Sequence, residues 1–135
     1  MIRTIRTSVL LMAVCVLPGC IGFSDKMTQQ TPTRVVLKQH EVCALSIMKP
    51  GEQMVSVEIF STGEGKRFEL FPDKPRYIAP DECLPMFSTA FRAGEKYAFY
   101  WNVVPVKGDA YLITAQFTLS TDSAGQPSSI TELNP

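Results

Sequence analysis

The sequence predicts an all-β fold, namely a small immunoglobulin-like antiparallel β-sandwich of about seven short strands. From residue 34 onward, apolar and polar residues alternate with a period of two. Turn-forming residues interrupt these runs at short intervals, with 10 Pro and 8 Gly among the 135 residues of the chain. No segment has the pattern of an amphipathic helix of ten or more residues. The length corresponds to one domain, and a small open barrel is the alternative fold.

The first residues are expected to be a targeting segment. Arg3 and Arg6 precede an apolar run of nine residues, 9–17, which is too short to span a bilayer. The run ends in Leu-Pro-Gly-Cys at 17–20, which resembles the lipobox of bacterial lipoproteins, where the cysteine is acylated. We therefore expect a lipoprotein signal peptide at residues 1–19 and a lipid on Cys20. An ordinary cleaved signal is the alternative.

The segment after Cys20 is expected to be a tether. An Asp after the lipidated cysteine would indicate retention in the inner membrane, and this chain has Ile21 there. We expect an outer-membrane anchor, with the folded part in the periplasm. Residues 20–33 are mostly polar and show no sustained period, so they are expected to form the lipidated N-terminus and a flexible tether. The β-sandwich domain is then expected at residues 34–135.

The strands are predicted from alternation and from the turns between them. In order, they cover residues 43–47, 55–59, 67–70, 76–79, 97–104, 111–119 and 129–133. The first two flank a Pro-Gly turn at 50–51, so we expect them to form a hairpin. In the two longest, one face is apolar and the other polar, which is typical of a half-buried antiparallel sheet. Trp101, on an apolar face, is expected to be buried.

Two cysteines remain after Cys15 leaves with the signal peptide and Cys20 takes a lipid. Cys43 and Cys83 are 40 residues apart, and in an oxidising compartment we expect them to form a disulfide. A loop of that size corresponds to roughly 4 kcal/mol of stability. The alternative is a nucleophilic Cys43 activated by His40, although positions three apart on a strand point to opposite faces.

Few residues could carry chemistry. His40 is the only histidine and lies in a polar stretch, so we expect a solvated loop residue. The carboxylates of Asp81 and Glu82 lie between two prolines and are expected in an exposed turn. The Gly63-Glu64-Gly65 segment lacks the Lys-Ser/Thr pair of a phosphate-binding loop. We therefore expect no catalytic residues, no cofactor, no metal and no small-molecule substrate, and we do not expect an enzyme.

The charge balance argues against a polyanionic partner. The chain has 13 basic and 13 acidic residues, and loss of Arg3 and Arg6 would leave 11 against 13. Basic residues are scattered singly, so no nucleic acid is expected. Tyr100 and Asn102, opposite the apolar face of their strand, are candidates for partner contact. The main prediction places partner binding elsewhere, on Glu64, Lys66, Arg67, Phe71 and Tyr77, which combine charge with aromatic rings.

Several blocks of sequence resemble a known family. They lie at residues 42–52, 54–59, 73–87 and 91–97, and two of them are centred on Cys43 and Cys83. Together with the lipobox they resemble small Gram-negative periplasmic lipoproteins described as type VI secretion immunity proteins. The resemblance implies an immunity protein that binds and neutralises a toxin delivered into the periplasm. It supplies no catalytic residues.

Two other functions stay open from the sequence. The first is a structural or accessory envelope lipoprotein that binds a cell-wall component or assists assembly of a surface machine. The second is a periplasmic hydrolase, whose activity would have to depend on His40 or on the carboxylates of Asp81 and Glu82.

Overall fold

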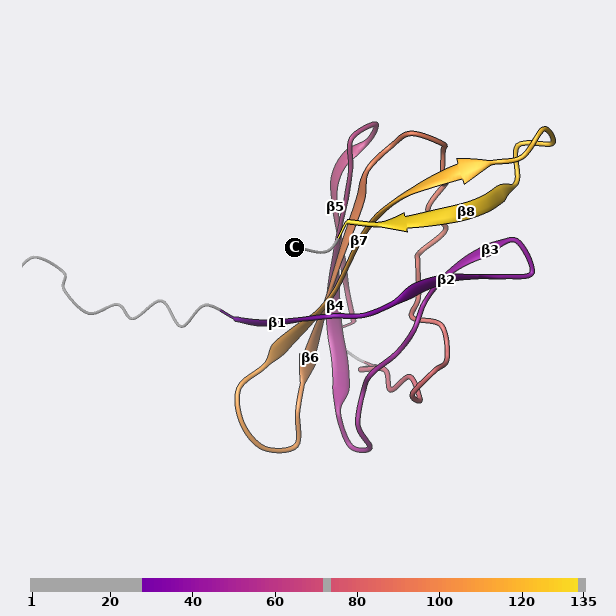
Figure 1. Cartoon of the computed structure of the whole chain (residues 1–135). Coiled ribbons are helices and arrows are strands. Elements are labelled where there is room, and N and C mark those ends of the chain that lie inside the picture. Colours follow the sequence, from indigo (N-terminus) through magenta and orange to yellow (C-terminus); the bar gives the residue numbers. More distant parts are fainter. Residues whose placement is uncertain (1–27, 72–73, 134–135) are drawn as a thin grey trace, which may run out of the picture.

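The structure, a computed structural model, describes residues 28–71 and 74–133, and these contain eight strands and no helix (Figure 1). The strands are β1 (Gln29–Pro32), β2 (Val35–Lys38), β3 (Glu41–Ala44), β4 (Gln53–Ser61), β5 (Gly65–Leu70), β6 (Tyr97–Val104), β7 (Tyr111–Thr121) and β8 (Pro127–Glu132). The described part of the chain therefore has no helix able to cross a membrane. The predicted signal peptide and Cys20 lie outside the described residues.

The main sheet has six strands. Its order is β1-β7-β6-β4-β5, and β8 pairs with the second half of β7. The run β7-β6-β4-β5 has the order of strands G, F, C and C′ in an immunoglobulin variable-type sheet. The predicted immunoglobulin-like sandwich is thus confirmed, with eight strands rather than about seven. One pair departs from the antiparallel arrangement, because β1 runs parallel to β7.

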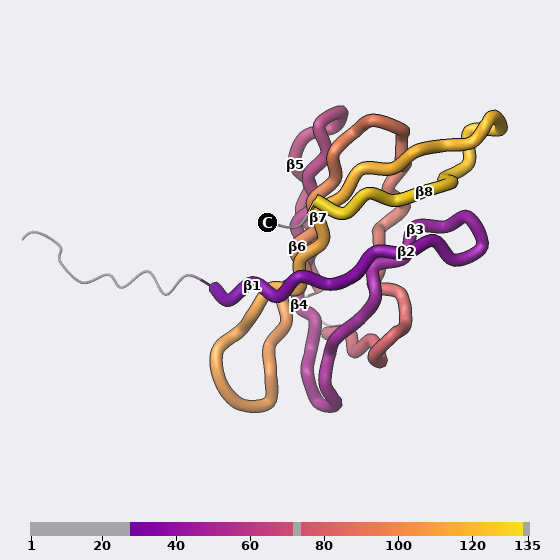
Figure 2. The backbone as a smooth tube through the Cα atoms, in the orientation of Figure 1, coloured from indigo at the N-terminus to yellow at the C-terminus, as the bar shows by residue number. Residues whose placement is uncertain are grey.

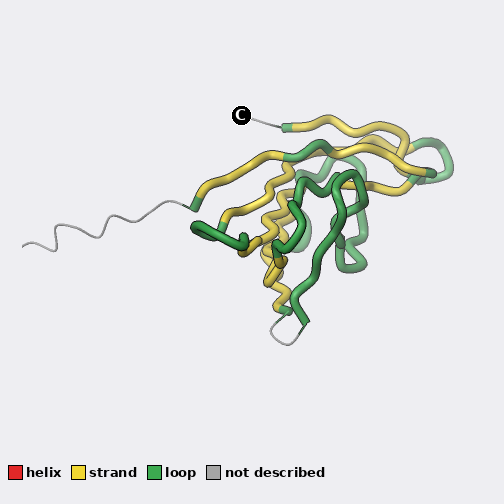
Figure 3. The backbone as a smooth tube through the Cα atoms, turned by 90° about the horizontal axis from the view of Figure 1, so that it is seen from below, coloured by secondary structure: helices red, strands yellow, loops and turns green. Residues whose placement is uncertain are grey.

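The second layer is small. It consists of the β2–β3 hairpin and the irregular segment between β5 and β6, which lies alongside the main sheet (Figures 1 and 3). An isolated bridge between Leu45 and Cys83 joins these two parts. The path from β1 into β2 is extended, so the chain pairs first with β7 and then with β3 as it passes between the layers (Figure 2).

The core is formed mainly by the inward faces of β6 and β7, as the alternation predicts. Phe99 stacks on Trp101 and on Phe117, with ring centroids 5.2 and 6.1 Å apart. Trp101 is fully buried, and its indole N–H donates to the carbonyl of Pro85 at 3.0 Å. Since Pro85 follows Cys83 by two residues, this bond holds the second layer onto the sheet.

Tyr97 begins β6 and forms the tyrosine corner that is typical of immunoglobulin-like sandwiches. Its hydroxyl accepts a hydrogen bond from the N–H of Arg92 at 2.6 Å and donates to the Glu95 carboxylate at 3.1 Å. Burial raises the pKa of this phenol. The corner fixes the point where the irregular segment re-enters the sheet.

One prediction about strand pairing was wrong. β3 pairs with β2 and β4 pairs with β5 and β6, so the predicted hairpin of 43–47 with 55–59 does not form. The chain instead crosses between the two layers over the Pro-Gly turn. In β4 a bulge at Val55 shifts the register, so that Met54 and not Val55 points into the core.

The folded region also begins earlier than predicted. Residues 29–32, which the sequence analysis assigned to the tether, form β1. β1 is largely exposed and is held by backbone pairing with β7, so its Gln-Gln-Thr-Pro sequence carries no hydrophobic signal. Pro32 is tolerated because β1 is an edge strand.

Candidate partner-binding site

Of the five residues predicted to bind a partner, three are exposed and two also make contacts within the fold. Glu64 and Lys66 are exposed at the β4–β5 turn and on β5, and Tyr77 is exposed in the irregular segment. Lys66 pairs with Glu58 at 2.9 Å, and this hydrogen bond raises the pKa of the lysine. These exposed side chains remain candidates for contact with a partner.

Arg67 and Phe71 are used within the fold. The Arg67 guanidinium donates to the Phe87 carbonyl at 2.9 Å and to the Thr89 hydroxyl at 3.0 Å. Phe71 stacks on Phe87, with ring centroids 5.2 Å apart, and the Arg76 guanidinium lies 4.9 Å from the Phe71 ring centre. Both residues therefore fasten the irregular segment to the sheet.

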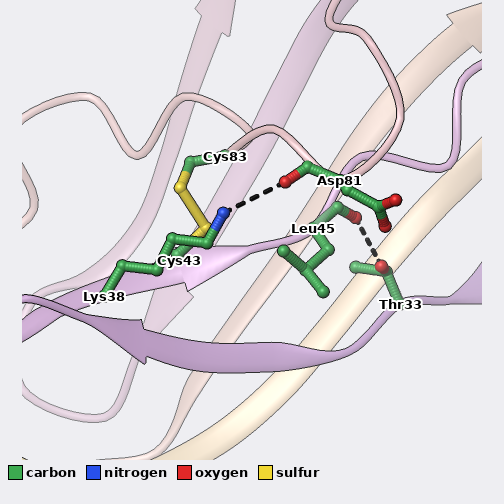
Figure 4. Close-up of a disulfide and its surroundings, with 6 residues drawn as sticks. All are labelled: Thr33, Lys38, Cys43, Leu45, Asp81 and Cys83. Atoms are coloured by element: carbon green, nitrogen blue, oxygen red, sulfur yellow. Dashed lines mark hydrogen bonds between the residues drawn. A yellow bond between two sulfur atoms is a disulfide. The ribbon is translucent and has the colours of Figure 1, made fainter.

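The predicted disulfide between Cys43 and Cys83 is present (Figure 4). Their Cα atoms are 5.1 Å apart, and Cys43 is buried. The Lys38 ammonium donates to the carbonyl of Asp81 at 3.1 Å, so a second contact supports the same junction. The alternative of a nucleophilic Cys43 is wrong, because its sulfur is bonded to Cys83.

The other candidates for chemistry lie in turns. His40 is exposed in the turn between β2 and β3, where Gln39 and His40 both have positive φ, 52° and 63°. This is the geometry of a type I′ hairpin turn. Asp81 and Glu82 are exposed, as predicted. Among the described residues, no three His, Cys, Asp or Glu side chains gather as a metal site would require.

A hollow lies at one end of the sandwich, between the β3–β4 and β6–β7 connections. It is open and has a volume of about 550 Å³. We call it the loop-end hollow, and its lining includes Ile47, Lys49, Glu52, Val106, Lys107 and Tyr111. In immunoglobulin variable domains the equivalent B–C and F–G loops form part of the recognition surface.

Glu52 holds the hollow in shape. Its side chain is only 5% exposed, and Oε1 accepts hydrogen bonds from the Lys49 N–H at 2.7 Å and the Tyr111 hydroxyl at 2.6 Å. Burial, reinforced by the bond to Glu52, raises the pKa of the Tyr111 phenol. One buried carboxylate thus ties the β3–β4 connection to the start of β7.

Gly51 lets the two connections approach each other. Its φ is +86°, and a Cβ at this position would lie 2.6 Å from Cγ2 of Val106. Only glycine combines this backbone conformation with so close a contact. The two walls of the hollow are therefore packed against each other at this point.

The rim of the hollow is apolar and charged, with the acidic Asp109 as well as two lysines. Val106 is 69% exposed, Ile47 is 36% exposed, and Lys49 and Lys107 are also exposed. Such a rim can receive a protruding apolar side chain that is flanked by charged groups. The arrangement suits binding, because the walls are already ordered before a partner arrives.

The family comparison covers this whole arrangement. A model of the family described as Domain of unknown function (DUF7480) matches residues 30–122. The chain belongs to the DUF7480 family. No curated protein and no solved structure matches it. The DUF7480 match includes both cysteines of the disulfide and both connections around the hollow, whereas β8 lies beyond it.

In this DUF7480 chain the two turns around the hollow can be recognised from residue types, but the hollow itself cannot. Segments 49–52 and 107–109 are recognisable as turns from Pro and Gly. Nothing in their spacing shows that they meet, since that depends on the order of β4, β6 and β7 in the sheet. The one sequence feature that could have indicated the hollow is Glu52, a single acidic residue directly after the Pro-Gly turn.

Proposed function

We propose that this protein is an immunity protein: a lipoprotein anchored to the outer membrane that binds and neutralises, in the periplasm, a toxin delivered by type VI secretion. The lipobox and the two cysteine-centred blocks support the assignment through their resemblance to such lipoproteins. The observation that carries the proposal is the loop-end hollow, a concave surface with an exposed apolar rim and walls held by the buried Glu52.

Neutralisation would follow from occupancy alone. A stable protein complex buries about 1,200–2,000 Å², with a few anchoring side chains that contribute most of the binding energy. The hollow would receive one such anchor from the toxin, and Val106 and Ile47 would cover it from the rim. Because the disulfide and Glu52 keep the loops ordered, little conformational entropy is lost on binding.

Toxin and protection can be tested together in cells. The product of the adjacent gene, directed to the periplasm, should stop growth of a Gram-negative host, and co-expression of the full-length chain should restore it. The two proteins should also co-purify from detergent-solubilised envelopes. A neighbour that is harmless without this protein and forms no complex would refute the proposal.

The binding surface has a matched control. Val106→Asp should abolish protection, because it places a carboxylate on the apolar rim of the hollow. Phe60→Asp, at an exposed phenylalanine on β4, should leave protection intact. If both variants protect equally, the toxin does not bind at the hollow. The immunity function itself is then still tested by co-purification.

The anchor is tested separately. Cys20→Ser should move the protein from the membrane fraction to the soluble periplasmic fraction, because acyl chains contribute about 0.8 kcal/mol per buried methylene. Retention of Cys20→Ser in the membrane would show that the lipobox is not the anchor.

A further inference from the structure

The strand β5 leaves an open edge on the main sheet. It is the last strand in the order β1-β7-β6-β4-β5 and contains neither proline nor a bulge. Phe68 and Leu70 on this strand are 56% and 63% exposed. Natural proteins usually protect such an edge, because unpaired backbone groups beside exposed apolar side chains attract another strand.

The backbone of β5 is set for pairing on its outer side. The Phe71 N–H donates to the Val55 carbonyl at 2.9 Å, so the backbone hydrogen-bonding groups of Phe71 point toward β4. By the alternation of an antiparallel pair, Arg67 and Glu69 are directed the same way. The backbone groups of Lys66, Phe68 and Leu70 therefore face the open edge, and within the described chain no other segment hydrogen-bonds to them.

The side chains of β5 alternate in an unusual sense. Phe68 and Leu70 lie on the exposed outer face of the sheet, as does Phe60 of β4. Arg67 lies opposite the buried Ile59 of β4, so its side chain is on the inner face. Arg67 and Glu69 form only a loose ion pair along the strand, with Nε 3.9 Å from Oε1. The strand thus carries two opposite charges on its inner face, and Lys66, Phe68 and Leu70 on its outer face.

We infer that the β5 edge pairs with β5 of a second copy of this chain, antiparallel, about a twofold axis at Phe68. This register places Arg67 of each copy opposite Glu69 of the other, and Phe68 opposite Phe68. Opposite charges facing each other across strands stabilise a pair. On the outer face, Lys66 of each copy lies opposite Leu70 of the other, on either side of the two Phe68 side chains.

Neighbouring registers lack this match. A twofold axis at Arg67 places two arginines opposite each other, and an axis at Glu69 places two glutamates opposite each other. An axis between two residues shifts the pairing by one and opposes Arg67 to Phe68. The charges of β5 therefore select one self-pairing. The inference concerns a surface away from the loop-end hollow and does not depend on the proposed toxin.

Cysteine cross-linking tests the pairing in the full-length chain in the cell envelope. Directly opposed residues of an antiparallel pair have Cα atoms about 5.5 Å apart, within disulfide range. Phe68→Cys should therefore give a disulfide-linked homodimer on a non-reducing gel. Phe60→Cys is the matched control, since it lies one strand further from the axis and opposite Lys66, which places it about 20 Å from its equivalent on the other copy.

Charge reversal tests the register. In the Phe68→Cys background, Arg67→Glu and Glu69→Arg should each lower the cross-linked fraction about fivefold, because both place like charges opposite each other. Co-expression of the two variants, with tags of different size, should restore cross-linking as a heterodimer. Opposite charges then face each other at both positions again.

Arg67 also bonds to Phe87 and Thr89, so a second comparison leaves it intact. Glu69→Arg should lower cross-linking more than Glu69→Gln, which removes the charge without repulsion. Three results would each overturn the inference: equal yields from these two variants, equal yields from Phe68→Cys and Phe60→Cys, or cross-linking of the Phe68→Cys variant only to a different protein.

Discussion

The loop-end hollow and the β5 edge both expose apolar side chains, but they are built in different ways. The hollow combines residues from β1 and from the β3–β4 and β6–β7 connections, and a buried carboxylate holds it together. The edge is one six-residue strand whose properties follow from its own alternation. A recognition surface for a foreign protein needs a shape that is fixed in advance, whereas self-pairing needs only a strand that complements itself.

The largest loss of stability is expected from removing the disulfide, because it stabilises the whole domain that carries both regions. Replacement of both Cys43 and Cys83 by Ala should lower the free energy of unfolding by roughly 4 kcal/mol, because the unfolded chain regains the entropy of the closed loop. Urea unfolding of the variant and of the parent protein measures this. Amide hydrogen exchange gives a second readout. If the amides of the second layer exchange rapidly while those at the hollow stay protected, the disulfide stabilises only the second layer.

A smaller effect should separate the two regions. Glu52→Ala should cost about 2 kcal/mol, since it leaves the Lys49 N–H and the Tyr111 hydroxyl without their buried acceptor. The matched change at the edge, Glu69→Ala, should alter stability by less than about 0.5 kcal/mol because that carboxylate is partly exposed. Urea midpoints at constant m-value provide the comparison. Equal losses would mean that Glu52 does not hold the hollow.

Alkaline pH should affect the hollow through a phenol whose pKa burial raises, whereas the edge contains no tyrosine and its Lys66 ammonium is exposed. The pKa of Tyr111 is raised in the folded state, so the unfolded chain loses this proton first. Its contribution to stability is complete below pH of about 10 and is lost as the pH rises further. Tyr111→Phe should therefore flatten the alkaline fall in stability. Tyr97, whose pKa burial also raises, should sustain part of that fall, and an unchanged slope would contradict the assignment.

The smallest changes in stability should give the clearest division of roles. Val106→Ser and Phe68→Ser replace exposed side chains, so each should change stability by less than about 0.5 kcal/mol. Val106→Ser should weaken protection against the toxin and leave association of the chain with itself unchanged. Phe68→Ser should do the reverse, as measured by cell survival and by light scattering of the detergent-solubilised protein. If one variant loses both protection and self-association, the two functions depend on the same surface.

Much of the fold follows from patterns that act locally. The alternation in β6 and β7 correctly identifies their buried faces, because one side of each strand packs on the core and period two is a direct record of that. The pairing of Cys43 with Cys83 follows from counting cysteines. β1 escaped prediction because an exposed edge strand is held by backbone hydrogen bonds, which any sequence can make.

The candidate site was harder to predict. Arg67 and Phe71 have the composition of contact residues, yet the irregular segment packs against both, and no local pattern records that packing. Glu52 looks like one more polar turn residue until Tyr111 of β7 is placed beside it.

Residue types and their spacing along the chain are enough to predict the fold class, the buried faces of the long strands, the disulfide and the charge pattern of β5. The first, second and fourth of these depend on residue types and their spacing along the chain. The disulfide follows because only two cysteines remain to pair with each other. The arrangement of the strands in space is needed to show which turns meet at the loop-end hollow and which charged and aromatic residues make contacts within the fold. These outcomes depend on strand order, which brings residues together that are dozens of positions apart and leaves no trace in local periodicity.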